Sequence, residues 1–477
     1  MEASSQFGAA AKDTNKAVVH LLNRAGFGPR PGQIRLILNK GLGRYLEEQL
    51  NPRADPPLAA QLLRFKSLRY SVATLLDIYH GRRAFVRGMS LVVEELQTAK
   101  VLRAIEAQNQ LEEVLVDFWF NHFNVNLQHQ FVRQSIIPYE RDAIRPFVFG
   151  KFADLLRATA RHPAMLFYLD NYLSRKNSTA NGTVIRGLNE NYGRELLELH
   201  TLGVDGGYSQ SDVVDAARCF TGWSIDDLKT KGRFVFRAAD HDQGPKRVFG
   251  LEIPAGGGVE DGERVLTYLA THPATARFVC FKLARRFVAD DPPLSLVDAC
   301  ARKFVETGGD LRSVTRTLFT SAEFQAAADQ PKYRTPFQYL AAALRATGAR
   351  VESAEPGLTW HLDKMGMRPY FCTPPTGWSD RGRDWQSSAH VYRLNFALDL
   401  ANDTIRGVQV RLSARLAGAR YDPGSSASIA AFFNREVFGG GLSERTLEAV
   451  KGLTKDHPGT VAKVAGLILS SPEMQSR

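Results

Sequence analysis

Residues that could do chemistry are densest in the segment 189–203 (NENYGRELLELHTLG), which carries three carboxylates, an arginine and a histidine. If this segment is an α-helix, Asn191, Glu195 and Glu198 lie at positions i, i+4 and i+7 and share one face. Carboxylates beside an apolar stripe are costly to bury unless they are paired or bind a metal. Two carboxylates in different surroundings are also what acid/base cleavage of a glycosidic bond requires. The spacing therefore predicts Glu195 and Glu198 as catalytic residues.

The same segment also has a purely structural interpretation. Arg194 and Glu198 lie at i and i+4, so an ion pair between them would fix the helix against the core. In the functional interpretation Arg194 binds the substrate next to the two glutamates. The spacing is compatible with both.

Polar and aromatic residues alternate in the segment 117–125 (DFWFNHFNV). On a helix Asp117, Asn121 and Asn124 share one face, and His122 lies beside it. We predict Asn121 as a substrate ligand, and His122 with His200 as ligands of a divalent metal. In this functional interpretation His122 could instead be a general base. The alternative is that His122 is a core histidine packed among aromatic rings.

A third cluster, Asp240-His241-Asp242, lies about forty residues after the first. A carboxylate next to a histidine favours the charged imidazolium and so tunes its acid/base strength. This predicts His241 and Asp242 as catalytic residues, with Lys246 holding an anionic group of the substrate. In the structural alternative, Asp242 forms an Asx-turn onto Gly244.

The Trp-rich loop, which we define as residues 367–388, contains TPPTGWSDRGRDW at 373–385. Trp378 is predicted to be a stacking platform for a sugar ring, with Asp380 or Arg381 reaching hydroxyl or anionic groups. Alternatively, the two tryptophans simply fix the loop to the core.

The elements that position these residues are predicted from apolar spacing of three and four residues. The fold class is mainly α: a multi-helix globular bundle with a minor β-hairpin and long functional loops. The hairpin would pair 232–238 with 246–250, and the loops are 174–189, 223–260 and 367–388. The predicted helices cover 17–24, 32–38, 45–50, 94–120 (one helix or two nearly continuous ones), 136–146, 150–160, 163–173, 190–202, 209–220, 261–287, 293–306, 310–320, 335–347, 388–416 and 442–470.

Two serines are predicted to start short helices. Ser321 and Ser471 lie in the similar stretches LFTSAEFQ and ILSSPEMQ, and serine is a preferred N-cap. Ala322 and Pro472 would then occupy the first helical positions. Along the chain we distinguish an N-terminal helical part (1–222) with the His/Asn/Glu motifs, a loop and small β excursion (223–260), and a C-terminal helical part (261–477) that contains the Trp-rich loop.

Composition indicates a soluble globular protein. The chain has 477 residues with 44% hydrophobic and 23% charged residues. Charges interrupt every apolar run before the ~18 residues that span a bilayer, so no membrane span is predicted. No signal peptide is visible, which predicts a cytoplasmic protein, or a periplasmic or exported one if a leader has been removed.

The net charge of +11 favours acidic partners such as an anionic polymer. We find no helix-turn-helix, RNA-binding or zinc-finger motif and therefore do not expect nucleic acid as the partner. The zincin, α/β-hydrolase, dinucleotide-binding and P-loop motifs are absent as well.

Several stretches together resemble the bacterial family catalogued as domain of unknown function 1800. They occur in the family's order and are 20–29 (HLLNRAGFGP), 117–125, 161–171 (RHPAMLFYLDN), 188–223, 241–250 and 374–378 (PPTGW). The resemblance implies a protein that is often exported and often encoded beside a sulfatase-like partner. The chain departs from the family at Phe147, where many relatives carry a histidine, and in having no visible leader.

Two functions are compatible with these patterns. In the first, the protein is an enzyme whose site forms where His122, Glu195, Glu198, His200, His241 and Asp242 converge. It would perform metal-assisted or acid/base chemistry on a polar substrate that is carbohydrate-like or anionic, a small molecule or a polysaccharide. In the second, it is a non-catalytic binding or assembly protein that partners a sulfatase-like protein or an anionic polymer, and the polar clusters fix helix packing.

Overall fold

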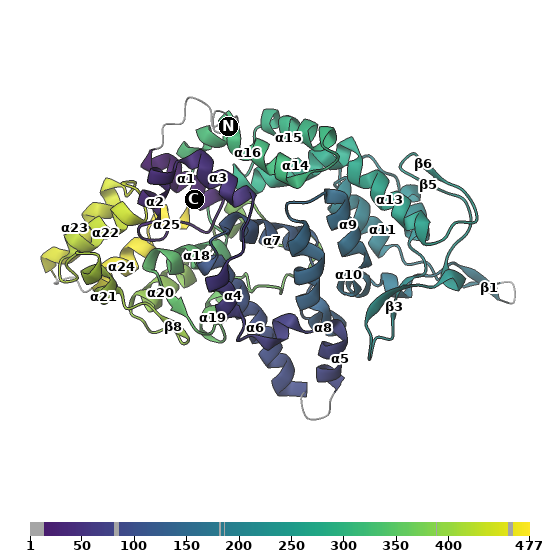
Figure 1. Cartoon of the computed structure of the whole chain (residues 1–477), viewed down its shortest axis with the longest axis horizontal. Coiled ribbons are helices and arrows are strands. Elements are labelled where there is room, and N and C mark those ends of the chain that lie inside the picture. Colours follow the sequence, from purple (N-terminus) through teal and green to yellow (C-terminus); the bar gives the residue numbers. More distant parts are fainter. Residues whose placement is uncertain (1–13, 81–84, 181–182, 186, 388, 457–460) are drawn as a thin grey trace.

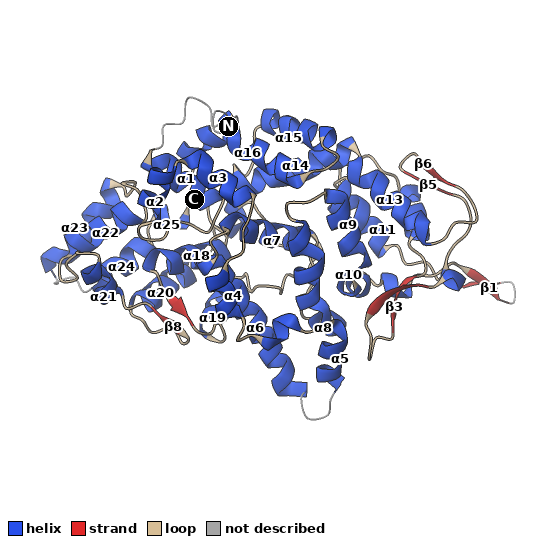
Figure 2. Ribbon diagram, in the orientation of Figure 1, coloured by secondary structure: helices blue, strands red, loops and turns tan. Residues whose placement is uncertain are grey.

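The computed structural model describes residues 14–80, 85–180, 183–185, 187–387, 389–456 and 461–477. The fold is mainly α, as predicted, and the strands lie at the periphery (Figure 2). Within the described residues they form four two-stranded antiparallel sheets. One hydrophobic core extends from Val18 to Met474. Helices from the beginning, middle and end of the chain therefore share it.

The helices of the first half are α1 (Asn15–Arg24), α2 (Gln33–Lys40), α3 (Leu42–Leu50), α4 (Pro56–Leu62), η2 (Lys66–Arg69), α5 (Val72–His80), α6 (Phe85–Glu106), α7 (Gln110–His122), α8 (Gln130–Pro138), η3 (Tyr139–Ile144), η4 (Arg145–Phe147), α9 (Phe152–Arg161), α10 (Pro163–Tyr168), η5 (Asn171–Leu173), α11 (Asn191–Glu195), η6 (Leu196–Thr201) and α12 (Gln210–Cys219).

Those of the second half are η7 (Ala238–Asp240), α13 (Val259–Thr271), α14 (Pro273–Phe287), α15 (Leu294–Glu306), α16 (Leu311–Thr320), α17 (Ala322–Ala326), η8 (Ala327–Asp329), α18 (Pro336–Thr347), α19 (Gly357–Lys364), η9 (Gly382–Trp385), α20 (His390–Ala401), α21 (Leu412–Gly418), α22 (Ser426–Glu436), α23 (Glu444–Asp456), α24 (Val461–Leu469) and α25 (Pro472–Gln475).

The central helices α6 and α7 lie between two ends of the molecule (Figure 1). One end holds the C-terminal helices α20 to α24, and the other holds the hairpins that follow α10 and α12. Helix α14 packs against α15, and α20 packs against α24. Arg334, just before α18, donates hydrogen bonds to Asn23 of α1 and to the backbone of Ser476, so the two ends of the described chain meet there.

Local signals explain where several helices begin and end. Ser321 and Ser471 cap α17 and α25, which confirms both predicted N-caps. The range 94–120 is covered by two nearly continuous helices, α6 and α7, which is one of the two forms predicted for it. The predicted helix 261–287 is also two: α14 starts at Pro273, which has no N–H to donate, and the His272 side chain accepts a hydrogen bond from the N–H of Ala274.

Two other predicted helices are also interrupted. The range 388–416 contains α20 and α21, with Asp403 and Gly407 at positive φ between them. The range 442–470 contains α23 and α24. Residues 388 and 457–460 of these predictions lie outside the described residues.

The predicted pairing of the β-hairpin is wrong. Strand β4 (Arg233–Phe236) pairs with β3 (Trp223–Asp226), whereas β5 (Lys246–Val248) pairs with β6 (Leu251–Ile253). The β5–β6 turn consists of Phe249 and Gly250, both with positive φ, which suits a tight two-residue hairpin. Each of these strands therefore pairs with its neighbour in the sequence.

The predicted loop 174–189 also contains a hairpin, β1 (Ser178–Ala180) with β2 (Thr183–Ile185). The fourth sheet pairs β7 (Arg350–Val351) with β8 (Val408–Gln409).

The helix that carries the glutamates is not a regular α-helix. From Leu196 it continues as the π-helix η6, in which the N–H of Leu202 donates to Leu197 O, five residues back. This wider turn changes the register of Glu198 and His200 relative to Glu195. A second π-helix, η3, contains Glu140. Such helices are rare and are often found at functional sites.

Candidate functional site

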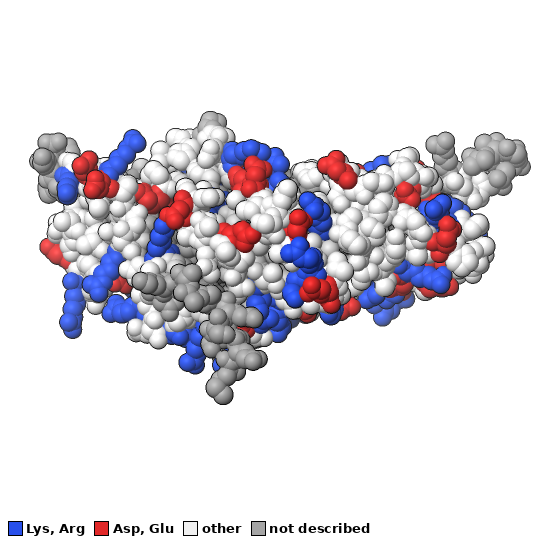
Figure 3. Space-filling model, turned by 90° about the horizontal axis from the view of Figure 1, so that it is seen from above, with Lys and Arg blue, Asp and Glu red and all other residues white. Residues whose placement is uncertain are grey.

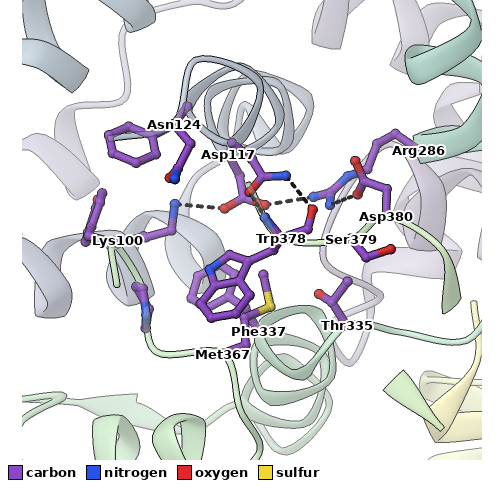
Figure 4. A pocket seen from close by; sticks show the side chains of 14 residues that line it. Lys100, Asp117, Asn124, Arg286, Thr335, Phe337, Met367, Trp378, Ser379 and Asp380 are labelled. Carbon is purple, nitrogen blue, oxygen red and sulfur yellow. Dashed lines mark hydrogen bonds and ion pairs between the residues drawn. The ribbon is translucent and has the colours of Figure 1, made fainter. Parts of the chain in front are cut away.

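A small cavity lies between α6, α7, α14, the start of α18 and the Trp-rich loop (Figure 4). Its volume is about 30 Å³, which is room for a water or two. The cavity is lined by Lys100, Asp117, Phe120, Asn121, Asn124, Arg286, Thr335, Phe337, Met367, Pro369, Tyr370, Trp378, Ser379 and Asp380.

Four charged side chains form a chain of ion pairs along one wall. Asp117 lies 2.8 Å from Lys100 Nζ and 2.8 Å from Arg286 Nη2. The other terminal nitrogen of Arg286, Nη1, lies 2.8 Å from Asp380 in the Trp-rich loop. Burial raises the pKa of Asp117, but Lys100 and Arg286 outweigh burial and hold it below the usual value. Three helices and the loop are thereby joined by alternating charges.

Aromatic rings form the opposite wall. Lys100 Nζ lies 5.1 Å from the ring centre of Tyr370 and 5.3 Å from that of Phe337, within the range of cation–π attraction. The Tyr370 hydroxyl donates a 2.6 Å hydrogen bond to Glu140 of η3. The cavity thus combines two cations, carboxylates and amides with apolar faces.

The face shared by Asp117, Asn121 and Asn124 fastens the Trp-rich loop to α7. The Asn121 amide donates to Trp378 O at 2.8 Å and accepts from the Trp378 N–H at 2.7 Å. Asn124 donates to the carbonyls of Cys372 and Pro374. Gly377, with φ +73°, lets the loop approach, because a Cβ there would lie 2.3 Å from Asn121 O.

The two histidines predicted as metal ligands are neighbours in an aromatic core. His122 and His200 are 2% and 1% exposed, and His122 Nε2 lies 3.1 Å from His200 O. Burial lowers the pKa of His122 well below its usual value and that of His200 to about 3. His122 Nδ1 and His200 Nε2 have no hydrogen-bond partner in the part of the chain that the structure describes. Among the described residues no group of three or more His, Cys, Asp or Glu side chains could hold a metal ion, so the divalent metal remains a prediction.

His241 and Lys246 converge on a buried carboxylate that the sequence did not single out, Asp261 of α13. His241 Nε2 lies 3.2 Å and Lys246 Nζ 2.7 Å from Asp261 Oδ2. The other imidazole nitrogen of His241 lies 2.8 Å from Thr221 O. The side chains of His241, Lys246 and Asp261 are all buried, and they connect β5 to α13 and to Thr221, which follows α12.

Asp242 has the contacts of the structural alternative. It accepts hydrogen bonds from Arg218 at 2.9 Å and from the N–H of Gly244 at 2.9 Å, which is an Asx-turn. These contacts hold the pKa of Asp242 below its usual value in spite of burial, which raises it. Its observed contacts are thus with neighbouring parts of the scaffold.

Glu195 differs from the other predicted residues. Arg194 pairs with Glu190 at 3.0 Å rather than with Glu198, and Glu198 accepts a 3.4 Å hydrogen bond from Tyr208. Glu195 is half-buried, and no residue in the described ranges gives it a hydrogen bond or an ion pair. Burial and then the nearby Glu198 raise the pKa of Glu195.

The predicted residues thus occupy several environments. Asn121 and Trp378 meet in the cavity, while His122 and His200 lie in the aromatic core. In the part of the chain that the structure describes, the hydrogen-bond and ring partners of His122 and His241 have no residue in common. Sequence reasoning missed Lys100 and Arg286, because neither has a local motif and each meets Asp117 only through packing of separate helices.

No helix of the described ranges is long and apolar enough to cross a membrane.

Comparison with known proteins gives one match. A search of curated proteins and of solved structures finds no match. The family model described as "Protein of unknown function (DUF1800)" matches residues 20–476. Because this match covers nearly the whole sequence, the chain belongs to the DUF1800 family.

Proposed function

We propose that the protein is a binding protein that recognises a polar, carbohydrate-like ligand beside Trp378. The observation that carries this proposal is the cavity, where aromatic rings face amides, carboxylates and a lysine held in fixed positions. Sugars present both apolar ring faces and hydroxyl groups, so a binding site needs both kinds of wall. The proposal therefore takes up the non-catalytic function of the two predicted from the sequence, with a carbohydrate-like ligand.

Ligand entry requires the Trp-rich loop to move. A volume of about 30 Å³ holds only a water or two, so a sugar ring does not fit the closed cavity. The loop is held by Asn121 and by the Arg286–Asp380 ion pair. We infer that ligand hydroxyls replace these contacts and that Trp378 covers the ring.

The other polar motifs support a structural role. His241, Lys246 and Asp242 each contact a scaffold residue, and satisfied buried polar networks fix a unique packing. An anionic polymer and a sulfatase-like protein remain the predicted partners of such a binding protein.

The test is a binding screen with neutral and anionic oligosaccharides, followed by calorimetry on two tryptophan variants. Trp378→Ala should weaken binding about five- to thirtyfold, because loss of one stacking face costs roughly 1–2 kcal/mol. Trp360→Ala is the control, since Trp360 is 49% exposed on α19 and does not line the cavity. Equal binding by both variants, or no binding by the wild type, would refute the proposal.

Glu195 supports a second candidate function, an acid/base enzyme. A half-buried carboxylate with a raised pKa and no partner among the described residues is suited to donate a proton, with Glu198 as the second carboxylate. Activity on a panel of aryl glycosides and esters should be lost in Glu195→Gln and kept in Glu190→Gln, whose carboxylate is already paired with Arg194. Hydrolysis that survives in Glu195→Gln would exclude this role.

A further inference from the structure

A second hollow, separate from the Trp378 cavity, lies between α1, the segment 327–331, the loop 438–441 and the C-terminal residues 473–477. Its volume is about 480 Å³, and none of its lining residues lines the first cavity. Those that matter here are Lys16, His20, Asn23, Gly440 and Arg477. The hollow is large enough to admit a hydrated ion or a small molecule.

Three buried guanidinium groups lie at or beside this hollow: Arg477 lines it, and Arg24 and Arg334 donate to its lining residues Gln330 and Asn23. Arg24, Arg334 and Arg477 are 0%, 4% and 8% exposed. Arg24 donates to the carbonyls of Val288 and Gln330, each at 2.9 Å. Within the described ranges none of the three forms an ion pair with a carboxylate. An uncompensated buried charge is costly, and the usual remedy is a counter-ion.

Backbone carbonyls and one amide take the place of carboxylates at the other two arginines. Arg334 donates to Met474 O and to Asn23 Oδ1, each at 2.7 Å. Arg477 donates to Arg286 O at 2.5 Å. These acceptors are neutral, so they satisfy hydrogen bonds without cancelling charge.

Positive charge therefore exceeds negative charge here. The lining cations Lys16 and Arg477 are balanced in number by the lining carboxylates Asp329 and Glu473, and Lys16 is ion-paired with Asp329. The excess of two comes from the buried Arg24 and Arg334 beside the hollow. The nearby Asp290 is already paired with Lys332. Burial and then Arg24 lower the pKa of His20, which lines the hollow, to about 3, as expected in a positive field.

Unused hydrogen-bond donors lie at the same place. Among the described residues the Nε atoms of Arg24 and Arg477 have no hydrogen-bond partner, and of these two arginines Arg477 lines the hollow. Gly439 and Gly440 have successive positive φ values of 60° and 94°, and a Cβ on Gly440 would meet nothing within 4 Å. The N–H groups of Gly440 and Gly441 already donate to Asn434 O and Phe438 O, so this loop leaves room for an anion but does not supply these donors.

We propose that this hollow binds a small oxyanion, a phosphate or sulfate group, between Arg477 and Lys16 and against the open side of Gly440. The oxyanion supplies the negative charge that the surrounding arginines lack. Its oxygens accept hydrogen bonds from the guanidinium and ammonium groups.

Calorimetric titration of the full chain with inorganic phosphate, and separately with inorganic sulfate, tests this at an ionic strength held constant with chloride. We expect saturable binding of at least one of the two, and the arm that binds identifies the oxyanion. Arg477→Gln should bind about tenfold more weakly because one charge-assisted contact is lost. Lys16→Gln alters an exposed rim residue that cannot disturb the core, and it should also weaken binding.

Two controls make the result specific. Lys303→Gln removes another exposed, ion-paired lysine and should bind as the wild type does. Trp378→Ala should also leave oxyanion binding unchanged, which separates this site from the proposed ligand cavity. Heats that do not exceed those of chloride, or wild-type affinity in Lys16→Gln, would overturn the proposal. If Arg477→Gln does not fold, Lys16→Gln decides the outcome.

Discussion

Asp117 belongs to the motif 117–125 and Glu195 to the motif 189–203, and the two carboxylates differ in the cations around them. Asp117 contacts both Lys100 and Arg286, whereas Glu195 has no ion-pair partner within the described chain. The pKa shifts follow: the pKa of Asp117 is lowered and that of Glu195 is raised. Single-residue substitutions should therefore have opposite effects on stability.

Replacing Asp117 should destabilise the protein strongly. Asp117→Asn leaves Lys100 and Arg286 buried without their shared counter-ion, and breaking such a pair costs about 3–5 kcal/mol. Urea unfolding measures the free energy of unfolding. Asp298→Asn, which removes an exposed pair with Arg277, is the control and should cost less than about 1 kcal/mol. Similar costs for both variants would show that the buried network adds no stability.

Replacing Glu195 should stabilise the protein above the pH at which glutamate ionises. The folded state has the raised pKa, so this group favours folding at low pH, and that contribution is lost as pH rises through the folded-state pKa. The glutamine of Glu195→Gln cannot ionise, so the variant does not lose this stability as the pH rises. Urea unfolding from pH 4 to 8 should show a stability difference from the wild type that grows with pH. A variant that is less stable at pH 7 would contradict the raised pKa.

At the scale of elements, much of the helical content follows from apolar spacing and caps. Ser321 and Ser471 start helices because each supplies a local acceptor to the helix N-terminus, and Pro273 forces a new helix because of its own geometry. The π-helix η6 was missed, because spacings of four and five residues are not distinguishable in a short leucine-rich segment. The hairpin partners were missed because a turn at Phe249-Gly250 was not recognised.

The junction of the Trp-rich loop with α7 depends on one glycine. Gly377→Ala places a Cβ against the Asn121 backbone and also strains a positive φ, so it should cost at least about 2 kcal/mol and speed proteolysis of the loop. Gly366→Ala is matched: its φ is +82°, but a Cβ there meets nothing within 4 Å. Gly366→Ala should lower the free energy of unfolding only by the strain of an alanine at positive φ, roughly 1 kcal/mol. Equal costs would mean that the close approach to Asn121 is unimportant.

At the scale of the whole molecule, the chain has a net charge of +11. On the face in Figure 3 acidic and basic side chains are interspersed, so no single basic patch on that face accounts for the charge. Part of the positive charge is buried, in arginines that donate to backbone carbonyls. Composition predicted the excess charge but not its location. The Lys100–Asp117–Arg286–Asp380 chain was likewise hidden, since it joins residues far apart in sequence that only the packed helices bring together.

The central claim is that a polar ligand binds beside Trp378 when the Trp-rich loop opens. A crystal structure of the protein with the oligosaccharide that binds best in the screen tests it most directly. We predict density for a sugar ring stacked on Trp378, with Asn121 and Asp380 on its hydroxyls and the loop displaced from α7. Density for the sugar elsewhere, with the loop closed and the Asn121–Trp378 hydrogen bonds intact, would contradict the claim.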